Sequence, residues 1–497
     1  MTQLANKSLL KQRRAGVLLH ISSLPSAHYV GDLGVEAYRF VDFLHAVGAS
    51  VWQTLPINMP HADNSPYQCL SAFAGNPDFI SLEILQRKFL LTKTDLKAPV
   101  SDKLPLIDKA YQAFCRKTKQ HKQQQKFTDF CTQQAHWLND FALFLALRCE
   151  FNQAGWHVWP EAYKNRDAKT LKQARKTLAH QIAVIQFSQF VFFTQWLKLK
   201  AYATAKQVYL FGDVPIFVAY DSADVWAQPH LFKLAADKSM AVVTGVPPDY
   251  FSENGQRWGN PHYNWNAMAA DGYAWWISRM ATQIALLDIV RIDHFRGLEA
   301  AWEIPATEET AINGAWVLAP GDDLLAAIIG ALPNICLVAE DLGIITDEVN
   351  ALRNKYDLPG MKILQFAFSG EKENPYLPHH IEENSVAYTG THDNDTTLGW
   401  YQAADEAQRQ HAHAYLQSFH VEQAELHMPK DLIDMAMKSN ALLAIVPMQD
   451  LLELDSSHRM NTPGTSTGNW HWRFNWQQLS LAQQEYIAGA ISLTRRS

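Results

Sequence analysis

In the stretch IVRIDHFRGL, residues 289–298, an apolar β-branched run passes directly into a cluster of charged and titratable side chains. Side chains two apart on a strand point to the same face, so Arg291 and Asp293 share one face while Ile292 packs on the other. An arginine beside an aspartate favours the ionised carboxylate and fixes its orientation. The stretch therefore predicts a buried strand that ends in a fixed, ionised carboxylate.

Several other short apolar runs along the chain share this form and end in Gly, Pro, Asp or His. Most are continuously apolar rather than alternating, as expected for parallel strands that are covered by helices. Amphipathic helical segments, such as residues 37–48 and 321–332, lie between several of them. Eight strands with helices between them predict an α/β fold, a (β/α)8 TIM barrel with helical and loop-rich insertions. The predicted strands are residues 15–25, 51–57, 208–217, 288–295, 334–343, 361–368, 385–393 and 441–450.

The uneven spacing of these strands indicates insertions into the barrel. Residues 58–207, between strands two and three, are too many for a loop and carry helical patterns such as ALFLALRCEF. We predict a mostly helical insertion there, and a loop-rich insertion over residues 216–287, between strands three and four. Residues 1–57 and 208–497 would then form the catalytic barrel.

The composition excludes several classes of protein. The net charge of -7 and the lack of a basic stripe argue against nucleic acid as a partner. The five cysteines are scattered and form no CxxC pair, so neither a disulfide framework nor a zinc site is indicated. The amino terminus has no apolar signal core, and the longest apolar runs are about half the length of a membrane helix. We expect a cytoplasmic protein with no membrane partner.

Carboxylates recur at the ends of the predicted strands. The active site of a (β/α)8 barrel forms at the C-terminal ends of its strands, so these groups should converge on one mouth. The residues at the predicted strand ends are Asp213, Arg291, Asp293, Glu340, Asp341, His392, Asp393, Asn394, Asp395, Gln449 and Asp450.

A pair of carboxyl groups with different charge states suits retaining glycoside chemistry. Asp293, ionised beside Arg291, could attack a sugar carbon, and Glu340, surrounded by other acids, could keep a proton for the departing oxygen. Structural ion pairs are the plain alternative. A zinc-dependent hydrolase is another, although strand one reads LLHISS and holds only His20 where such enzymes carry an HxH pair. A phosphate-binding barrel would need Gly-rich turns after strands seven and eight, which read DNDTTLGW and DLLELDSS.

Long ordered motifs give the chain a resemblance to the 4-α-glucanotransferases, the amylomaltase or disproportionating enzymes, which are relatives of the α-amylases. The resemblance runs from about residue 14 to residue 476. Its motifs are SPYQCLSAFAGNP (65–77), GDVPIFVAYDSADVWA (212–227), GVPPDYFSENGQRWGNP (245–261), RIDHFRG (291–297), VAEDLG (338–343), GTHDNDTTLGW (390–400) and MNTPGTSTGNWHWR (460–473).

The resemblance implies a role for each matching residue. Asp293 would be the nucleophile, Glu340 the general acid/base, and Asp393 the third carboxylate, which holds sugar hydroxyls and stabilises the distorted sugar. Asp341 and Asp395 rank behind Glu340 and Asp393 as supporting residues. The implied substrate-binding residues are Tyr67, Asp213, Asp249, Tyr250, Trp258, Arg291, His294 and His392.

The resemblance also implies the reaction. A segment of an α-1,4-glucan would move to the 4-hydroxyl of glucose or of another α-1,4-glucan through a covalent glycosyl-Asp293 intermediate, with no metal and no organic cofactor. The alternatives are an α-amylase-type hydrolase on the same scaffold and a non-catalytic glucan-binding protein. Residues 57–64 depart from the family pattern, because they lack the usual Gly-rich run with an aromatic residue. We expect this departure to alter how the donor glucan is held and which chain lengths are preferred.

Overall fold

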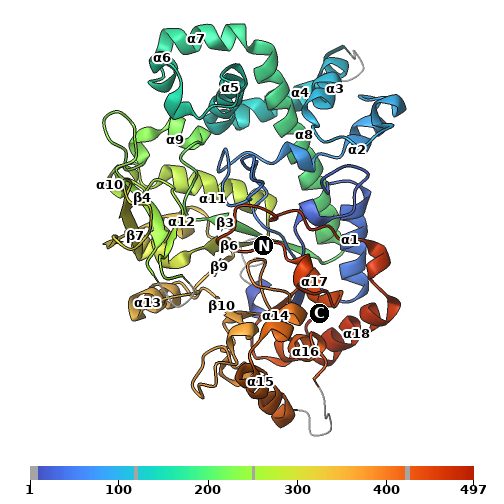
Figure 1. Cartoon of the computed structure of the whole chain (residues 1–497). Helices are drawn as coiled ribbons and strands as arrows, with labels where there is room; N and C mark the ends of the chain where they lie inside the picture. The colour runs from blue at the N-terminus through green and yellow to red at the C-terminus, as the bar shows by residue number, and fades with distance from the viewer. Residues whose placement is uncertain (1–8, 117–120, 249–251, 420–425) are drawn as a thin grey trace.

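A computed structural model describes residues 9–116, 121–248, 252–419 and 426–497. Eight parallel strands form one sheet in the order β10-β11-β12-β1-β2-β3-β6-β9, with helices around it (Figure 1). The backbone N–H of Ala339 donates to the Pro359 carbonyl at 2.9 Å, which joins β9 to the segment entering β10 and brings the two sheet edges together. The predicted (β/α)8 barrel is confirmed. Its strands are β1 (Arg14–Leu18), β2 (Val51–Gln53), β3 (Tyr209–Pro215), β6 (Ile289–Asp293), β9 (Leu337–Ala339), β10 (Gly360–Ile363), β11 (Ser385–Tyr388) and β12 (Leu443–Pro447).

Each predicted strand overlaps one barrel strand, and all eight barrel strands are shorter than predicted. The ladder ends where the chain turns outward, so several of the polar residues assigned to strand ends lie in the following loops. Asp293 is the last residue of β6, Glu340 directly follows β9, and Asp393 lies beyond β11 in the loop at residues 389–396.

The alternation of side chains in β6 shows how the barrel sorts its residues. Val290 and Ile292 belong to the large apolar core between the strands and the helices. Ile289 belongs to a separate core that fills the barrel interior with side chains such as Phe211 and Ile445. Arg291 and Asp293 share the parity of Ile289 and therefore face the interior. A strand of continuous apolar residues thus carries charge only where its inward face reaches the barrel mouth.

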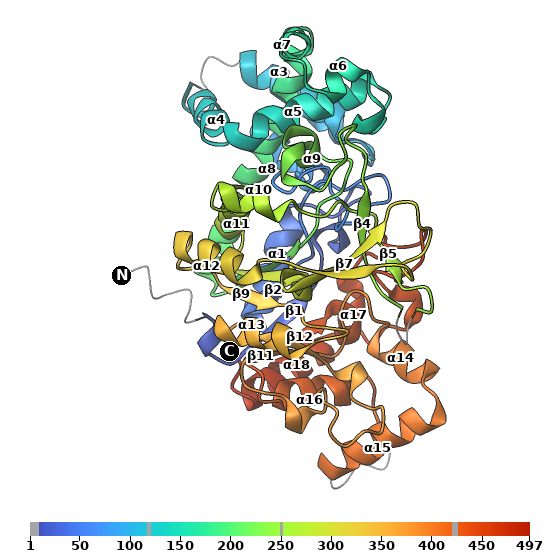
Figure 2. The same ribbon diagram turned by 90° about the vertical axis from the view of Figure 1, so that its left-hand side faces the viewer.

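Helices surround the barrel and cover the outer face of its strands (Figures 1 and 2). Their apolar stripes pack on the outward residues of the strands, which explains why those strands read as continuously apolar. The helices that follow or precede barrel strands include α1 (Val35–Ala46), α11 (Ala274–Leu286), α12 (Gly321–Ala331), α13 (Asp347–Lys355), α14 (Thr397–Ala403), α15 (Glu406–Phe419), α16 (Lys430–Lys438), α17 (Met448–Leu451) and α18 (Leu481–Leu493).

The segment between β2 and β3 holds a group of helices that stands above the barrel in Figure 1. Its last helix, α8, runs without a break and belongs to both parts of the molecule. Near its C-terminal end, the indole N–H of the fully buried Trp196 donates to the Leu286 carbonyl of α11 at 2.8 Å. The helices of this segment are α2 (Leu82–Arg87), α3 (Leu104–Arg116), α4 (His121–Gln133), α5 (Ala135–Glu150), α6 (Glu161–Lys164), α7 (Ala168–Thr177) and α8 (Ala179–Ala205).

A second, antiparallel sheet lies beside the barrel in the order β5-β4-β7-β8, and the sequence analysis did not predict it. Two of its strands come from the segment expected to be rich in loops, and two follow β6. The same segment also contains short helices besides α11. The elements are β4 (Val242–Val246), β5 (Gln256–Arg257), β7 (Ala300–Pro305), β8 (Ala315–Leu318), α9 (Ala223–Ala227) and α10 (Trp265–Ala270).

None of the helices in the described part of the chain combines the length and the apolar character needed to cross a membrane.

Candidate active site

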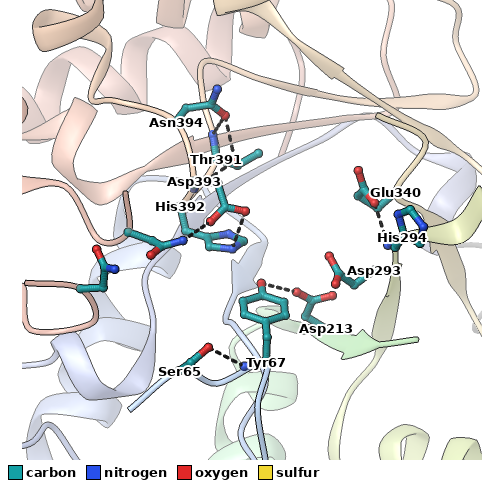
Figure 3. A network of polar contacts seen from close by, with 12 residues as sticks. Ser65, Tyr67, Asp213, Asp293, His294, Glu340, Thr391, His392, Asp393 and Asn394 are labelled. Carbon is teal, nitrogen blue, oxygen red and sulfur yellow. Dashed lines mark hydrogen bonds and ion pairs between the residues drawn. The ribbon is translucent and has the colours of Figure 1, made fainter. Parts of the chain in front are cut away.

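The centre of the barrel mouth is an arginine that binds two strands together. The Arg291 guanidinium, 4% exposed, donates from Nε to Asp213 Oδ1 at 2.8 Å and from Nη2 to Asp213 Oδ2 at 2.5 Å. The same Nη2 lies 2.9 Å from Asp293 Oδ1. A buried cation needs such partners, because an uncompensated charge in the interior is costly. Arg291 therefore fixes Asp213 and Asp293, which lie side by side in Figure 3, relative to each other.

Tyr67 closes this network from the loop after β2. Its hydroxyl donates to Asp213 Oδ2 at 2.7 Å and accepts from Arg291 Nη2 at 3.1 Å. Its ring stacks on the His392 imidazole, with centroids 5.2 Å apart and planes inclined by 10°. The tyrosine therefore links the Arg291 network on β3 and β6 to the loop that follows β11 (Figure 3).

Opposing effects act on the Asp293 carboxyl group. Burial in the mouth and the neighbouring carboxylates, Asp213, Glu340 and Asp393, raise the pKa of Asp293 well above its ordinary value, although the Arg291 guanidinium acts to lower it. The prediction of an ionised Asp293 therefore depends on the contact with Arg291. The side chain is still 28% exposed, so it lies at the floor of the mouth and not beneath it.

Within the described part of the chain, the hydrogen bonds to Glu340 come from backbone donors. Its Oε2 accepts from the His294 N–H at 2.7 Å, and its Oε1 accepts from the Leu342 N–H at 3.2 Å. Burial is the main cause that raises the pKa of Glu340 to about 7, with a smaller contribution from Asp341 and opposition from Arg291 and the two N–H groups. We predicted a raised pKa from neighbouring acids, but burial contributes more than they do.

Asp393 is in the opposite state. Its Oδ1 accepts from Asn461 Nδ2 at 2.6 Å, and its Oδ2 lies 3.2 Å from His392 Nε2. Burial raises the pKa of Asp393, but these two partners outweigh it and lower the pKa to about 2. The side chain is 48% exposed, so we attribute its ionised state to the two partners.

His294 contacts both Glu340, the candidate general acid/base, and Trp258. The residue has left-handed backbone angles, φ 53° and ψ 53°, which are uncommon for a residue with a side chain and turn its N–H toward Glu340. The Trp258 ring meets the imidazole edge-on at 4.7 Å. Burial lowers the pKa of His294 to about 3, so the ring is neutral at ordinary pH.

The carboxylates that neighbour the three main candidates have structural partners. Asp341 accepts from Arg353 Nη1 at 2.8 Å and from the Met361 N–H at 2.7 Å. Asp395 accepts from Ser456 Oγ at 2.8 Å. Asp450, 1% exposed, accepts from the Thr389 hydroxyl and from the Thr397 N–H and hydroxyl. These bonds occupy the carboxylates and favour Glu340 and Asp393 as the groups that face a ligand.

Two residues of this mouth, Asn461 and Arg459, were not predicted from the sequence. Arg459 donates from Nη2 to the Asp393 carbonyl at 2.9 Å, beside the Asn461 bond to the carboxylate. Both lie in the segment around MNTPGTSTGNWHWR, which marked the family resemblance but gave no role to single residues. Asp249 and Tyr250 lie outside the described residues, and their predicted roles stay predictions.

Among the residues that the structure describes, no group of three or more His, Cys, Asp or Glu side chains is placed to hold a metal ion.

A parallel (β/α)8 barrel with perturbed titratable groups gathered at the C-terminal ends of its strands belongs to the class of barrel enzymes. Comparison with known proteins gives the family. A family model described as 4-alpha-glucanotransferase matches residues 19–479. The chain belongs to the 4-alpha-glucanotransferase family, which transfers glycosyl groups.

Individual relatives match this chain over nearly its whole length. A 4-alpha-glucanotransferase of Thermus thermophilus is 45% identical over 97% of this chain and 99% of its own length. One from Synechocystis sp. is 44% identical over 97% of both chains. Among solved structures, the amylomaltase of Streptococcus agalactiae in complex with acarbose superposes with a TM-score of 0.93 and 34% identity, covering 98% of this chain and 100% of that one.

Proposed function

We propose that this protein transfers a segment of an α-1,4-glucan to the 4-hydroxyl of glucose or another α-1,4-glucan by a retaining double displacement. Asp293 attacks the anomeric carbon of the donor while Glu340 protonates the departing oxygen, and a glycosyl-Asp293 ester forms. Glu340 then takes the proton of the acceptor 4-hydroxyl, whose oxygen attacks the same carbon and releases Asp293. Each proton given by Glu340 returns to it, so the cycle needs no cofactor.

The observation that carries this proposal is the unequal environment of two neighbouring carboxyl groups. Repulsion between two carboxylates raises the pKa of whichever is second to ionise, so near neutral pH the pair holds one proton. The guanidinium 2.9 Å from Asp293 favours the negative charge there. Burial, which raises the pKa of Glu340 to about 7 against the opposing effect of Arg291, favours the proton on Glu340. This distribution is the one that the first displacement requires.

The remaining candidates support the reacting sugar. An ionised Asp393 next to His392 offers acceptors and a donor to sugar hydroxyls, and its negative charge stabilises a developing oxocarbenium ion. Arg291 and Asp213 hold Asp293 in place, and Tyr67 supplies an aromatic ring at the floor of the mouth. Asp249 and Tyr250 stay in the proposal as glucan contacts by resemblance alone. Relatives named as 4-alpha-glucanotransferases, and one solved with acarbose, support a glucan ligand.

Transfer competes with hydrolysis, because water and sugar can both attack the intermediate. An acceptor wins only when it is bound in position and bulk water is kept away. Trp258 lies edge-on to His294, whose N–H donates to Glu340, and in this proposal it would contact such an acceptor. The scattered cysteines favour a reducing compartment, and we place the reaction in the cytoplasm.

The test is incubation of the purified protein with maltotriose and a chelator, followed by separation of the products. Glucose together with oligosaccharides longer than maltotriose is the expected result. Steady conversion to glucose and maltose without longer products would instead identify an α-amylase-type hydrolase, and glucan affinity without turnover would identify a binding protein.

The covalent step has its own test. Glu340→Gln incubated with α-maltosyl fluoride should accumulate a maltosyl adduct on the peptide that contains Asp293, because fluoride leaves without a proton and the second step lacks its base. The matched control is the double variant Asp293→Asn, Glu340→Gln, which should show no adduct by intact mass. An adduct on any other residue would contradict the assignment of Asp293.

A further inference from the structure

Trp316 is an exposed aromatic residue that the proposed reaction does not use. It lies in β8, the edge strand of the antiparallel sheet, and is 37% exposed. Its partner in the register of β7 is Trp302, whose ring meets it at 5.2 Å and 63°. A large ring on an edge strand is held firmly here and still reaches solvent.

A cation covers one face of the Trp316 ring. The guanidinium carbon of Arg296 lies 3.6 Å from the ring centroid, a close cation–π contact. Arg296 is itself buried, and its Nη1 donates to the Ile344 carbonyl at 2.7 Å. The exposed surface of Trp316 therefore belongs to the part of the ring that Arg296 and Trp302 do not cover.

These contacts place Trp316 on the same side of the barrel as the reacting groups. Arg296 lies in η8 (Phe295–Leu298), three residues after Asp293, and Ile344 lies four residues after Glu340. Both segments continue from the C-terminal ends of barrel strands, so both lie at the mouth. Four residues of extended chain span at most about 14 Å, which bounds the separation of Ile344 from Glu340.

Because Trp316 lies on the Glu340 side of the mouth, it belongs to the side where an acceptor would bind. In the mechanism proposed above, Glu340 acts on the oxygen of the departing and then of the incoming sugar, so glucan units on its side belong to the leaving group and the acceptor. Asp393 and His392 occupy the opposite side, in the loop after β11 (Figure 3). An exposed indole on the Glu340 side of the mouth is therefore placed to meet sugars of an acceptor chain beyond the one that reacts.

Resting on the proposed function, we propose that the exposed face of Trp316 is a stacking platform for the acceptor glucan, several sugars beyond the reacting bond. A flat, rigid ring offers a large apolar surface at low entropic cost, which suits the apolar face of a sugar. The platform would bind sugars of an acceptor chain other than the one held at Glu340, so we expect it to favour long acceptors over short ones.

The experiment measures acceptor KM for glucose and for maltohexaose with α-maltosyl fluoride as the donor. In Trp316→Ala, KM for maltohexaose should rise about 3- to 10-fold, the scale of one aromatic contact, while kcat and KM for glucose keep their wild-type values. Trp316→Phe should recover most of the loss. Leu318→Ala, an exposed aliphatic side chain on the same strand, is the matched control and should change neither constant.

Three results would overturn the platform. The first is an equal KM for maltohexaose in Trp316→Ala and the wild type. The second is an equal rise in KM for glucose and for maltohexaose in Trp316→Ala, which would show that the ring only supports Arg296. Light scattering that shows a dimer for the wild type and a monomer for Trp316→Ala would instead assign the β8 edge to contact with a second copy of the chain. If the wild type transfers to neither acceptor, the proposed function fails, and the platform fails with it.

Discussion

Glu340 and Asp393 lie at the mouth of one barrel and differ in the partners that hold them. Glu340 accepts hydrogen bonds from two backbone N–H groups, and burial is the main cause that raises its pKa to about 7. Asp393 accepts from the Asn461 amide and contacts the His392 ring, which together lower its pKa to about 2. The comparison shows that one pocket can hold a proton on one acid and a charge on another when their donors differ.

The difference assigns the two acids to different steps. A group that keeps its proton near neutral pH can deliver it, whereas a group that is ionised at every ordinary pH can only bind hydroxyls and stabilise positive charge. The following predictions test this division, beginning with the largest expected effect.

Removing the proton donor should have the largest effect. Glu340→Gln keeps the shape and loses the proton, and we expect kcat on maltotriose to fall about 10²- to 10⁴-fold. With α-maltosyl fluoride, the first step should recover, because fluoride needs no proton to leave. A variant that retains most of its activity on maltotriose would show that another residue is the acid.

Neutralising the second acid should cost somewhat less. Asp393→Asn removes a charge that stabilises the transition state, and we expect kcat/KM to fall about 10²- to 10³-fold. Unlike Glu340→Gln, this variant should gain nothing from a fluoride leaving group. Asp395→Asn is the matched control, because that carboxylate is bonded to Ser456 and should have a much smaller effect.

The alkaline limb of the pH profile should report the proton on Glu340. Its raised pKa of about 7 means that the protonated form persists up to that pH and is lost above it, so activity should fall about tenfold for each further pH unit. Asp393, with a pKa of about 2, stays ionised throughout and should add no limb between pH 4 and 9. An activity that is constant from pH 6 to 9 would contradict the division.

The smallest effect should come from the amide that supports Asp393. Asn461→Ala removes the 2.6 Å bond to Oδ1, and we expect about a tenfold loss in kcat/KM, the scale of one hydrogen bond to a charged group. Asn461→Asp should be worse than alanine, because it places a second carboxylate against the first and raises the pKa of Asp393. Equal activity in the wild type and Asn461→Ala would show that His392 alone fixes Asp393.

The barrel was predictable because its strands are locally encoded. Continuous apolar runs that stop at polar residues marked all eight strands, and side-chain parity placed Arg291 and Asp293 on one inward face. The antiparallel sheet carried no comparable signal, because β5 has two residues, both exposed, and β8 is largely exposed.

Only those residues of the candidate site that lie at or just after the ends of barrel strands could be predicted from the sequence. Asn461 and Arg459 reach Asp393 from 68 and 66 residues further along the chain, and no local pattern announces that contact. The raised pKa of Glu340 was predicted from its acidic neighbours, but burial, which depends on the whole packed mouth, contributes most.

The continuous α8 has a consequence for engineering the molecule. Its early turns pack with α5 and α7 of the helical segment, and its last turns lie against α1 and β3 of the barrel. Cutting out residues 58–207 as a cassette would strip the barrel of the helix that covers it between β2 and β3. A shortened enzyme should therefore be designed by removing parts of α3 to α7 and keeping the whole of α8, which packs on the outside of the barrel.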